Sequence, residues 1–238
     1  MVLVAPANLL LAYGPPLALL AALRRAAILS ESNPRIVTHG FLAGIPAVLP
    51  AVAALAAVAY LTAYLPGLHL PGSHPPGVPR LLWRSFGLSA GIEELSKLAA
   101  LAVIVRLHRS NLTAGVIVLA GAAAGAGFAF VENSLYLIDM PRIIGLRLLT
   151  AGLLHVAAAA ISGYGIALVA YRYGGMLPWV VCAILLHGAY NLLIDLGGLA
   201  ALWAPLVPVL AALVAWSRYN RAVQFRLPGR RTRAYPDS

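Results

Sequence analysis

The feature that most constrains this chain is a series of long apolar runs. Each run holds about 20 residues, and a helix of that length crosses roughly 30 Å of hydrocarbon. We therefore predict a transmembrane helix for each run. The seven runs lie at 6–23, 42–65, 84–105, 112–136, 147–170, 177–196 and 199–217.

The composition agrees with a membrane protein. Of the 238 residues, 61% are hydrophobic and only 10% are charged, with a mean hydropathy of +0.87. A soluble domain carries about 25% charged residues. The sequence therefore predicts an all-α, polytopic membrane helical bundle of about seven transmembrane helices. We divide it into one membrane domain, 1–217, and a basic tail, 218–238, which is expected to be disordered and to rest on anionic lipid.

The distribution of the basic residues predicts the orientation. With the N-terminus outside, twelve arginines lie on the cytoplasmic side and four on the outer side, which favours an outer N-terminus and a cytoplasmic C-terminus. The net charge of +10 is thus a topology signal and does not indicate nucleic-acid binding. The cytoplasmic set is Arg24, Arg25, Arg35, Arg106, Arg109, Arg172 and six arginines from Arg218 to Arg233; the outer set is Arg80, Arg84, Arg142 and Arg147.

One of the runs carries charged residues in its middle. The segment GIEELSK places Glu93, Glu94 and Lys97 inside the apolar stretch 81–107. A charged side chain at bilayer depth costs at least a few kcal/mol, so such residues mark functional sites. A buried ion pair that fixes helix packing is the structural alternative.

Three other runs carry polar residues at a similar depth. At 1.5 Å of rise per residue, Glu93 and His155 lie about 14 Å and 12 Å from the outer end of their runs, and His187 about 15 Å from the inner end of its own. The three side chains are therefore predicted to meet at one level. The polar residues of these three runs are Glu132, Asn133, His155, His187, Asn191 and Asp195.

The spacing within the runs predicts which side chains share a face. His187, Asn191 and Asp195 recur every four residues and therefore lie on one side of a helix. Glu93 and Lys97 are also four apart, so the lysine is expected to hold a carboxylate ionised. Glu94 is rotated by about 100° from Glu93 and is expected to project elsewhere.

A second pattern concerns helix packing. The small residues at 121–127 predict that the fourth run approaches a neighbouring helix closely. Lone residues such as His155 also allow a bland interpretation, a hydrogen bond between helices, and Asp195 can equally be a rim residue.

The polar set suits hydrolysis by water. Crowded carboxylates in a low dielectric cannot all stay ionised, so at least one is expected to exchange protons near neutral pH. A glutamate base and histidine or asparagine donors would support attack of water on a carbonyl. The sequence has no serine in a triad setting and no zinc helix of the H-E-x-x-H type.

These residues resemble the four motifs of PrsW-type intramembrane proteases. The matching pieces are Glu93-Glu94-x-x-Lys97, Phe128-x-x-x-Glu132-Asn133, His155 and His187-x-x-x-Asn191, in the family's order over roughly 85–196. The stretch GAGFAFVENSLY around Glu132 is the most specific of them. More distantly, the chain is similar to the CAAX prenyl endopeptidases, a group also called glutamic intramembrane proteases.

The resemblance implies an endopeptidase that cleaves a membrane protein, such as an anti-sigma factor in regulated proteolysis. By analogy Glu93 and His187 would activate the water, and Asn191 with His155 would bind the oxyanion. Glu94 would tune the base, while Glu132 is a site member without an assigned role. Lys97, Asn133 and Asp195 are expected as supporting residues.

The resemblance leaves the cofactor and the biology as expectations. The family has also been classed as metalloprotease, and a zinc ion would be held by Glu93, Glu132, His155 and His187; we expect a metal-free reaction and no cofactor. The expected substrate is a single-span or membrane-anchored protein, at the plasma membrane of a bacterium. The alternatives are a proton-coupled transporter, for which matched broken helices are missing, and a non-catalytic scaffold. The oligomeric state stays open.

Overall fold

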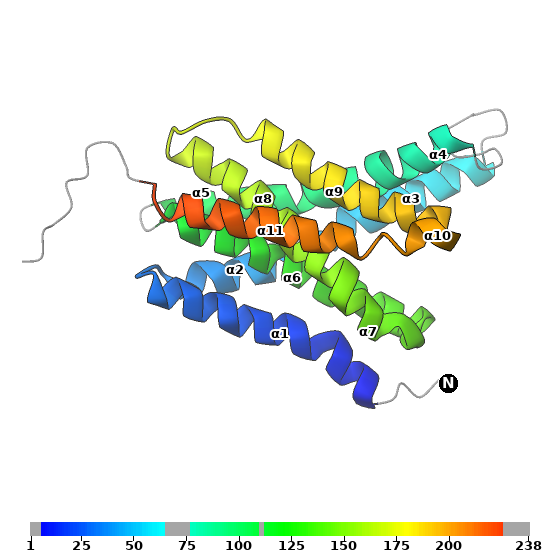
Figure 1. The fold of residues 1–238 in the computed structure, drawn as a ribbon, viewed down its shortest axis with the longest axis horizontal. Helices are drawn as coiled ribbons and strands as arrows, with labels where there is room; N and C mark the ends of the chain where they lie inside the picture. The colour runs from blue at the N-terminus through cyan, green and yellow to red at the C-terminus, as the bar shows by residue number, and fades with distance from the viewer. Residues whose placement is uncertain (1–5, 65–76, 110–111, 226–238) are drawn as a thin grey trace, which may run out of the picture.

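The computed structural model describes residues 6–64, 77–109 and 112–225, and over these ranges every regular element is helical (Figure 1). The elements are α1 Pro6–Leu29, α2 Pro34–Gly44, α3 Val48–Tyr64, α4 Val78–Leu82, η1 Trp83–Gly91, α5 Ile92–Leu107, α6 Ala114–Asp139, η3 Pro141–Ile143, α7 Ile144–Arg147, η4 Leu148–Gly152, α8 Leu153–Ala170, α9 Leu177–Leu196, α10 Gly198–Ala201 and α11 Leu206–Ala222. Residues 1–5, 65–76, 110–111 and 226–238, which include most of the predicted basic tail, lie outside the described part.

The long helices form the predicted all-α polytopic bundle. In the described residues, six helical stretches are long and apolar enough to cross a membrane. They are Pro6–Leu29, Pro34–Val58, Ala114–Ile138, Pro141–Ala170, Leu177–Leu196 and Gly198–Ala222. The seventh predicted run, 84–105, is helical as well, in η1 and α5, but three charged side chains in its middle keep it out of that set.

Two predicted boundaries are wrong at the ends of the chain. The second span begins at Pro34 instead of 42, because Asn33 caps it by accepting a hydrogen bond from the Arg35 amide at 3.0 Å. The polar residues in this first stretch, Arg35 and His39, hid the helix from a hydropathy count. At the other end α11 continues to Ala222, so the predicted tail is helical in its first residues.

The predicted boundary between the last two runs, 177–196 and 199–217, is confirmed. α9 ends at Leu196, and Gly197 and Gly198 have φ angles of 67° and 53°. This left-handed backbone is accessible to glycine without steric cost, so the two residues turn the chain into α10.

α6 and α8 form the buried centre of the bundle, with α1, α2, α5, α9 and α11 packed around them (Figure 1). The predicted close approach at 121–127 is confirmed. A Cβ on Gly121 would lie 2.5 Å from the Ala159 carbonyl oxygen, and one on Gly125 would lie 2.2 Å from that of His155. Glycine thus brings the two backbones into contact and fixes where His155 stands.

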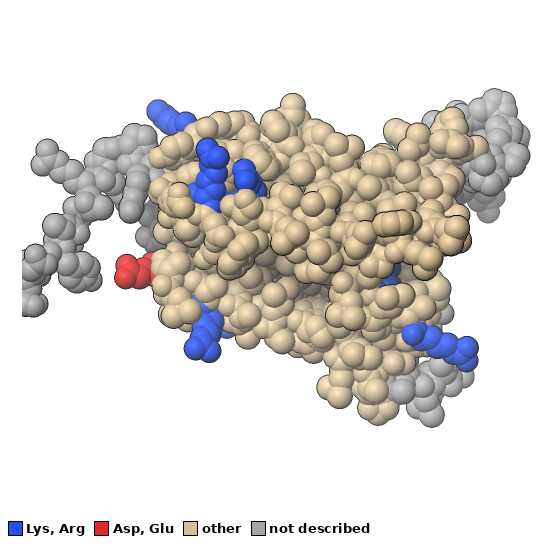
Figure 2. Space-filling model, viewed as in Figure 1, with Lys and Arg blue, Asp and Glu red and all other residues tan. Residues whose placement is uncertain are grey.

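The helices that carry Glu93 and His155 each contain a wider, π-helical segment just before these residues. η1 and η4 are π-helical segments, and they end two residues before Glu93 and three before His155. Such segments are uncommon and frequently accompany functional sites. On the surface, charged side chains gather toward the two ends of the long axis and the face between them is almost free of charge (Figure 2).

Candidate functional site

Four helices bring their polar residues to one place inside the bundle. We call this group the polar centre: Glu93, Glu94 and Lys97 of α5, Glu132 of α6, His155 of α8 and His187 of α9. All are buried with at most 7% exposure except Glu132, whose side chain is 19% exposed. The predicted meeting of three spans at one depth is therefore borne out.

His187 lies between the two glutamates. Its Nδ1 is 2.7 Å from Glu94 Oε1, and its Nε2 is 3.6 Å from Glu93 Oε2. The expectation that Glu94 projects away from the histidines was wrong. Although adjacent residues point about 100° apart, the imidazole ring fills the angle between them and offers one nitrogen to each.

Lys97 pairs with Glu94 and not with Glu93. Its Nζ lies 2.5 Å from Glu94 Oε1, three residues back along the helix, and 3.1 Å from His155 Nδ1. The four-residue spacing to Glu93 had suggested the other partner. Because both groups of the pair are almost fully buried, the ammonium compensates a carboxylate that has no access to water.

Glu132 is the partner of His155. Its Oε2 lies 2.6 Å from His155 Nε2 and also 2.9 Å from Arg147 Nη2, while the Arg147 guanidinium lies 3.4 Å from the centre of the Tyr136 ring. A carboxylate between two donors is an acceptor, so this geometry gives Glu132 the role of orienting the histidine.

The two histidines and Glu93 direct three lone-pair atoms toward one another. We assign the tautomers from the hydrogen-bond network, with His187 donating through Nδ1 to Glu94 and His155 donating through Nε2 to Glu132. His187 Nε2, His155 Nδ1 and Glu93 Oε2 then converge, all within 4.8 Å of one another. Glu93 Oε2 is buried and accepts no hydrogen bond from a described residue.

This donor set fits a divalent metal. Two histidines and one carboxylate with an open position are the ligands of many catalytic zinc sites, and ligating histidines usually donate their other nitrogen to a carboxylate. Both histidines do so here. The predicted fourth ligand, Glu132, is instead bound to the far nitrogen of His155. A metal on His155 Nδ1 would require Lys97 to release that atom.

A hydrogen-bonded ladder leads from the polar centre toward one end of the bundle. Ser89 donates to Glu93 Oε1 at 3.0 Å and accepts from Asn191 Nδ2 at 2.9 Å. Further out, Asp195 Oδ2 accepts from Ser85 at 3.4 Å and lies 3.8 Å from Arg84 Nε. The predicted stripe on α9 thus faces the start of α5 at His187 and η1 at Asn191 and Asp195.

Sequence reasoning missed two members of this arrangement. Ser89 stands four residues before Glu93, a spacing that could have shown it on the same face. Arg147 was counted only as a topology marker, although it binds Glu132. Asn133, expected as a supporting residue, turns away from the site and donates to the Ala12 carbonyl of α1 at 3.4 Å.

A polar cavity of about 400 Å³ lies beside this ladder. It is at the end of the bundle where α7 lies and α9 ends, which can be found in Figure 1. Its lining combines the ladder with apolar residues of α6, η3, α7 and α9. The lining includes Arg84, Ser85, Ser89, Tyr136, Ile143, Arg147, Tyr190, Asn191 and Asp195.

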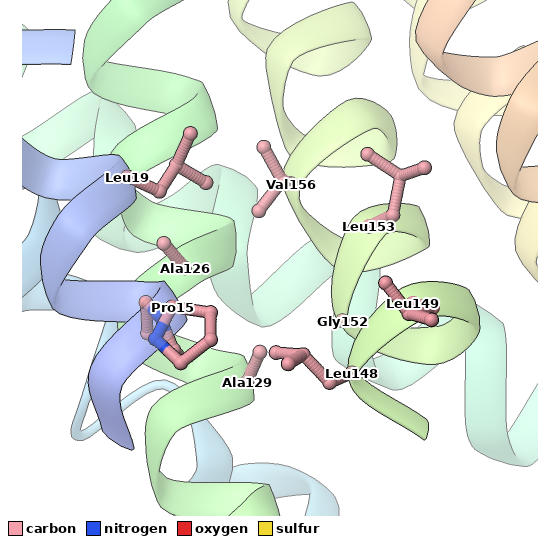
Figure 3. Close-up of a pocket in the computed structure, with 10 residues that line it drawn as sticks. Pro15, Leu19, Ala126, Ala129, Leu148, Leu149, Gly152, Leu153 and Val156 are labelled. Carbon is pink, nitrogen blue, oxygen red and sulfur yellow. The ribbon is translucent and has the colours of Figure 1, made fainter. Parts of the chain in front are cut away.

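A second cavity, of about 340 Å³, is lined without charged groups. It lies between α1, α6 and the start of α8, where Pro15, Ala129, Leu148 and Val156 point into it (Figure 3). No ionisable side chain lines it, so the chemistry belongs to the polar cavity.

The model of the PrsW family of intramembrane metalloproteases matches residues 33–217, which contain the whole polar centre. Searches of curated proteins and of solved structures found no match.

Proposed function

The chain belongs to the PrsW family of intramembrane metalloproteases, and from this premise we propose that its polar centre hydrolyses a peptide bond of a membrane protein. The observation that carries the proposal is the convergence of Glu93 Oε2, His155 Nδ1 and His187 Nε2 within 4.8 Å. Three acceptor atoms around one point favour a group that brings protons or positive charge. Lys97 already supplies a donor to His155 Nδ1 at 3.1 Å, and a water molecule or a metal ion would serve the other two atoms.

In this proposal Glu93 is the base that takes the proton of the attacking water. Ser89 holds its Oε1, so the unpartnered Oε2 is directed at the two histidines. A positioned base of this kind contributes about 10²–10⁴-fold to rate. The glutamate later returns the proton to the leaving amine.

The other two carboxylates orient the histidines. Glu94 fixes the ring of His187 and Glu132 fixes that of His155, so that each presents an unprotonated nitrogen to the reaction point. Lys97 compensates the buried charge of Glu94. In this proposal Glu93 is the base and the other two glutamates each orient one histidine, which is a more specific role for Glu94 than the expected tuning of the base.

Glu93, His155 and His187 are also the residues that would hold a metal ion. A zinc ion there would polarise the substrate carbonyl and make hydroxide available near neutral pH.

Asn191 has a second amide proton beyond the one that it donates to Ser89, and we assign that proton to the oxyanion of the tetrahedral intermediate. His155 is not assigned to the oxyanion, because its donor nitrogen is engaged by Glu132.

The polar cavity would admit the substrate. It supports cleavage of an extended segment that enters between η1, α7 and the end of α9, next to the end of a membrane span. With the N-terminus outside, that end lies on the outer face, which suits a single-span or membrane-anchored substrate of the anti-sigma-factor type. The predicted residence in a bacterial plasma membrane belongs to the same proposal.

A proton-coupled transporter is less well supported. A relay needs polar groups toward both membrane faces. On the inner side of Lys97, α5, α6 and α8 pack through a buried apolar cluster that includes Leu101, Ile117 and Ala160, and the buried residues described there on these helices include no acidic side chain, lysine, arginine or histidine. The polar ladder runs only the other way.

The test is cleavage of candidate single-span proteins by purified, reconstituted enzyme. We expect Glu93→Ala and His187→Ala to abolish cleavage while the variants still insert into the membrane. Cys182→Ala, near the inner end of α9 and away from the polar centre, is the matched control and should cleave normally. Undiminished cleavage by both site variants would refute the proposal.

A further inference from the structure

A second polar region lies at the opposite end of the bundle, where α5 and α8 end. Two adjoining cavities of about 580 and 280 Å³ meet there and share Val105, Arg109, Ile166 and Val169 in their linings. Arg172 lines the larger cavity and Arg106 the smaller one. We call this the arginine cleft, and we propose that it binds the phosphate headgroup of an anionic phospholipid.

Charge is the first argument. No ion pair joins Arg106, Arg109 or Arg172 to a carboxylate of the described residues, whereas the arginines lining the polar cavity at the other end, Arg84 and Arg147, each have one. The guanidinium group matches a phosphate in a bidentate fashion. Three such groups around the two adjoining cavities therefore favour an anion with several acceptor oxygens.

The backbone of Arg172 is the second argument. α8 ends in a Schellman turn, in which the Tyr173 amide donates to the Leu168 carbonyl at 2.9 Å and the Arg172 amide to that of Val169 at 3.2 Å. Arg172 occupies the left-handed position of this turn, with φ of 59°. Glycine is the residue that this position favours, and a side chain here strains the backbone.

The strain at Arg172 has a functional explanation in the cleft. The chain supplies Gly174 and Gly175 in the same connection but an arginine at the one position where glycine would fit best. Residues with a strained backbone conformation cluster at functional sites, where the role of the residue offsets the cost of the strain. Here the side chain lines the cavity that it shares with Arg109.

The apolar part of the lining identifies a lipid as the ligand. Val105, Ile166 and Val169 continue the cleft along α5 and α8 toward the apolar middle of the bundle. A free phosphate would use only the arginines, whereas a phospholipid would also place its acyl chains on these side chains. Basic clefts between transmembrane helices are suited to such headgroups.

The test compares lipids on one delipidated preparation. We expect phosphatidylglycerol to raise the thermal midpoint of the full chain in detergent, and phosphatidylcholine or inorganic phosphate to leave it nearly unchanged. Arg109→Ala and Arg172→Gly should lose most of the phosphatidylglycerol shift, and native mass spectrometry should show less bound lipid. Arg24→Ala, which removes an exposed arginine of α1, should keep both.

Arg172→Gly separates ligand binding from folding. In detergent without lipid, its midpoint should equal or exceed that of the wild type, because glycine relieves the turn. A full phosphatidylglycerol shift in Arg172→Gly, or an equal shift with inorganic phosphate, would overturn the proposal. A lower midpoint of this variant without lipid would remove the argument from the backbone.

Discussion

The polar centre is held by two helix seams that work in different ways. Between α6 and α8, glycines bring backbone against backbone, as where Gly125 meets the His155 carbonyl. Between η1–α5 and α9, the contact is a hydrogen-bonded ladder in which Ser89 meets Asn191 and Glu94 meets His187. Each seam delivers one histidine to Glu93.

The difference shows that one seam fixes the distance between helices and the other fixes the direction of the polar side chains. The α6–α8 seam fixes a distance by excluding side chains, so it should fail when atoms are added. The α5–α9 seam fixes directions by hydrogen bonds, so it should fail when polar atoms are removed. The substitutions below are chosen to break one seam while leaving the other intact.

The largest effect is expected at Glu93, which both seams serve. Glu93→Gln keeps the volume and the hydrogen bond from Ser89 but removes the base, so the cleavage rate should fall by about 10²–10⁴-fold. Single-turnover cleavage of a reconstituted substrate measures this. A loss below tenfold would show that another group takes the proton.

Next come the two carboxylates that orient the histidines. Glu132→Gln on one seam should weaken zinc binding by about 10–100-fold. On the other seam, Glu94→Gln with Lys97→Met should weaken it less, because the lysine that competes for His155 Nδ1 is removed together with the carboxylate. Lys97 is replaced together with Glu94 because a buried ammonium without its carboxylate would destabilise the protein by itself.

Competition with a metal chelator measures this affinity without reference to cleavage. If the wild type retains no zinc, and the chelator leaves cleavage unchanged, the metal would be ruled out and Glu93 would act alone.

The glycine seam should respond to added volume. Gly125→Ala should lower the free energy of unfolding by about 1–3 kcal/mol, because its Cβ would lie 2.2 Å from a backbone oxygen that cannot move aside cheaply. Gly14→Ala on α1 is the matched control, since a Cβ there meets no atom within 4 Å. Equal thermal midpoints for the two variants would show that the seam is not close-packed.

The smallest effect is expected at Ser89. Ser89→Ala removes one hydrogen bond to Glu93 and one from Asn191, which should slow cleavage about tenfold through a lower kcat with little change in KM. Ser89→Thr keeps the hydroxyl and should restore most of the rate. A variant that changes KM alone would place Ser89 in substrate binding instead.

The glycine seam was easier to predict than the polar one. The small residues at 121–127 predict close approach from their size alone. A count of residues from the span ends likewise placed Glu93, His155 and His187 at one depth. Both follow from one-dimensional quantities, volume and rise per residue.

The ladder was harder because it depends on direction. An ideal helix separates Glu93 and Glu94, and nothing in the sequence showed that one imidazole would bridge them. The π-helical segment η1 also changes the angle between residues before Glu93 and those after it, and a count based on 3.6 residues per turn does not predict that change. The predicted partner of Lys97 was wrong because a helix allows an ion pair at a spacing of three residues as well as four, and the sequence does not show which of the two forms.

The central claim is that Glu93, His155 and His187 act as one unit. The most direct measurement is the single-turnover cleavage rate of Glu93→Gln, His155→Gln and His187→Gln, each alone and all three together. Residues that share one catalytic step lose activity non-additively, so the triple variant should be about as slow as the slowest single variant. Losses that multiply across the three positions, or a single variant with normal cleavage, would contradict the account.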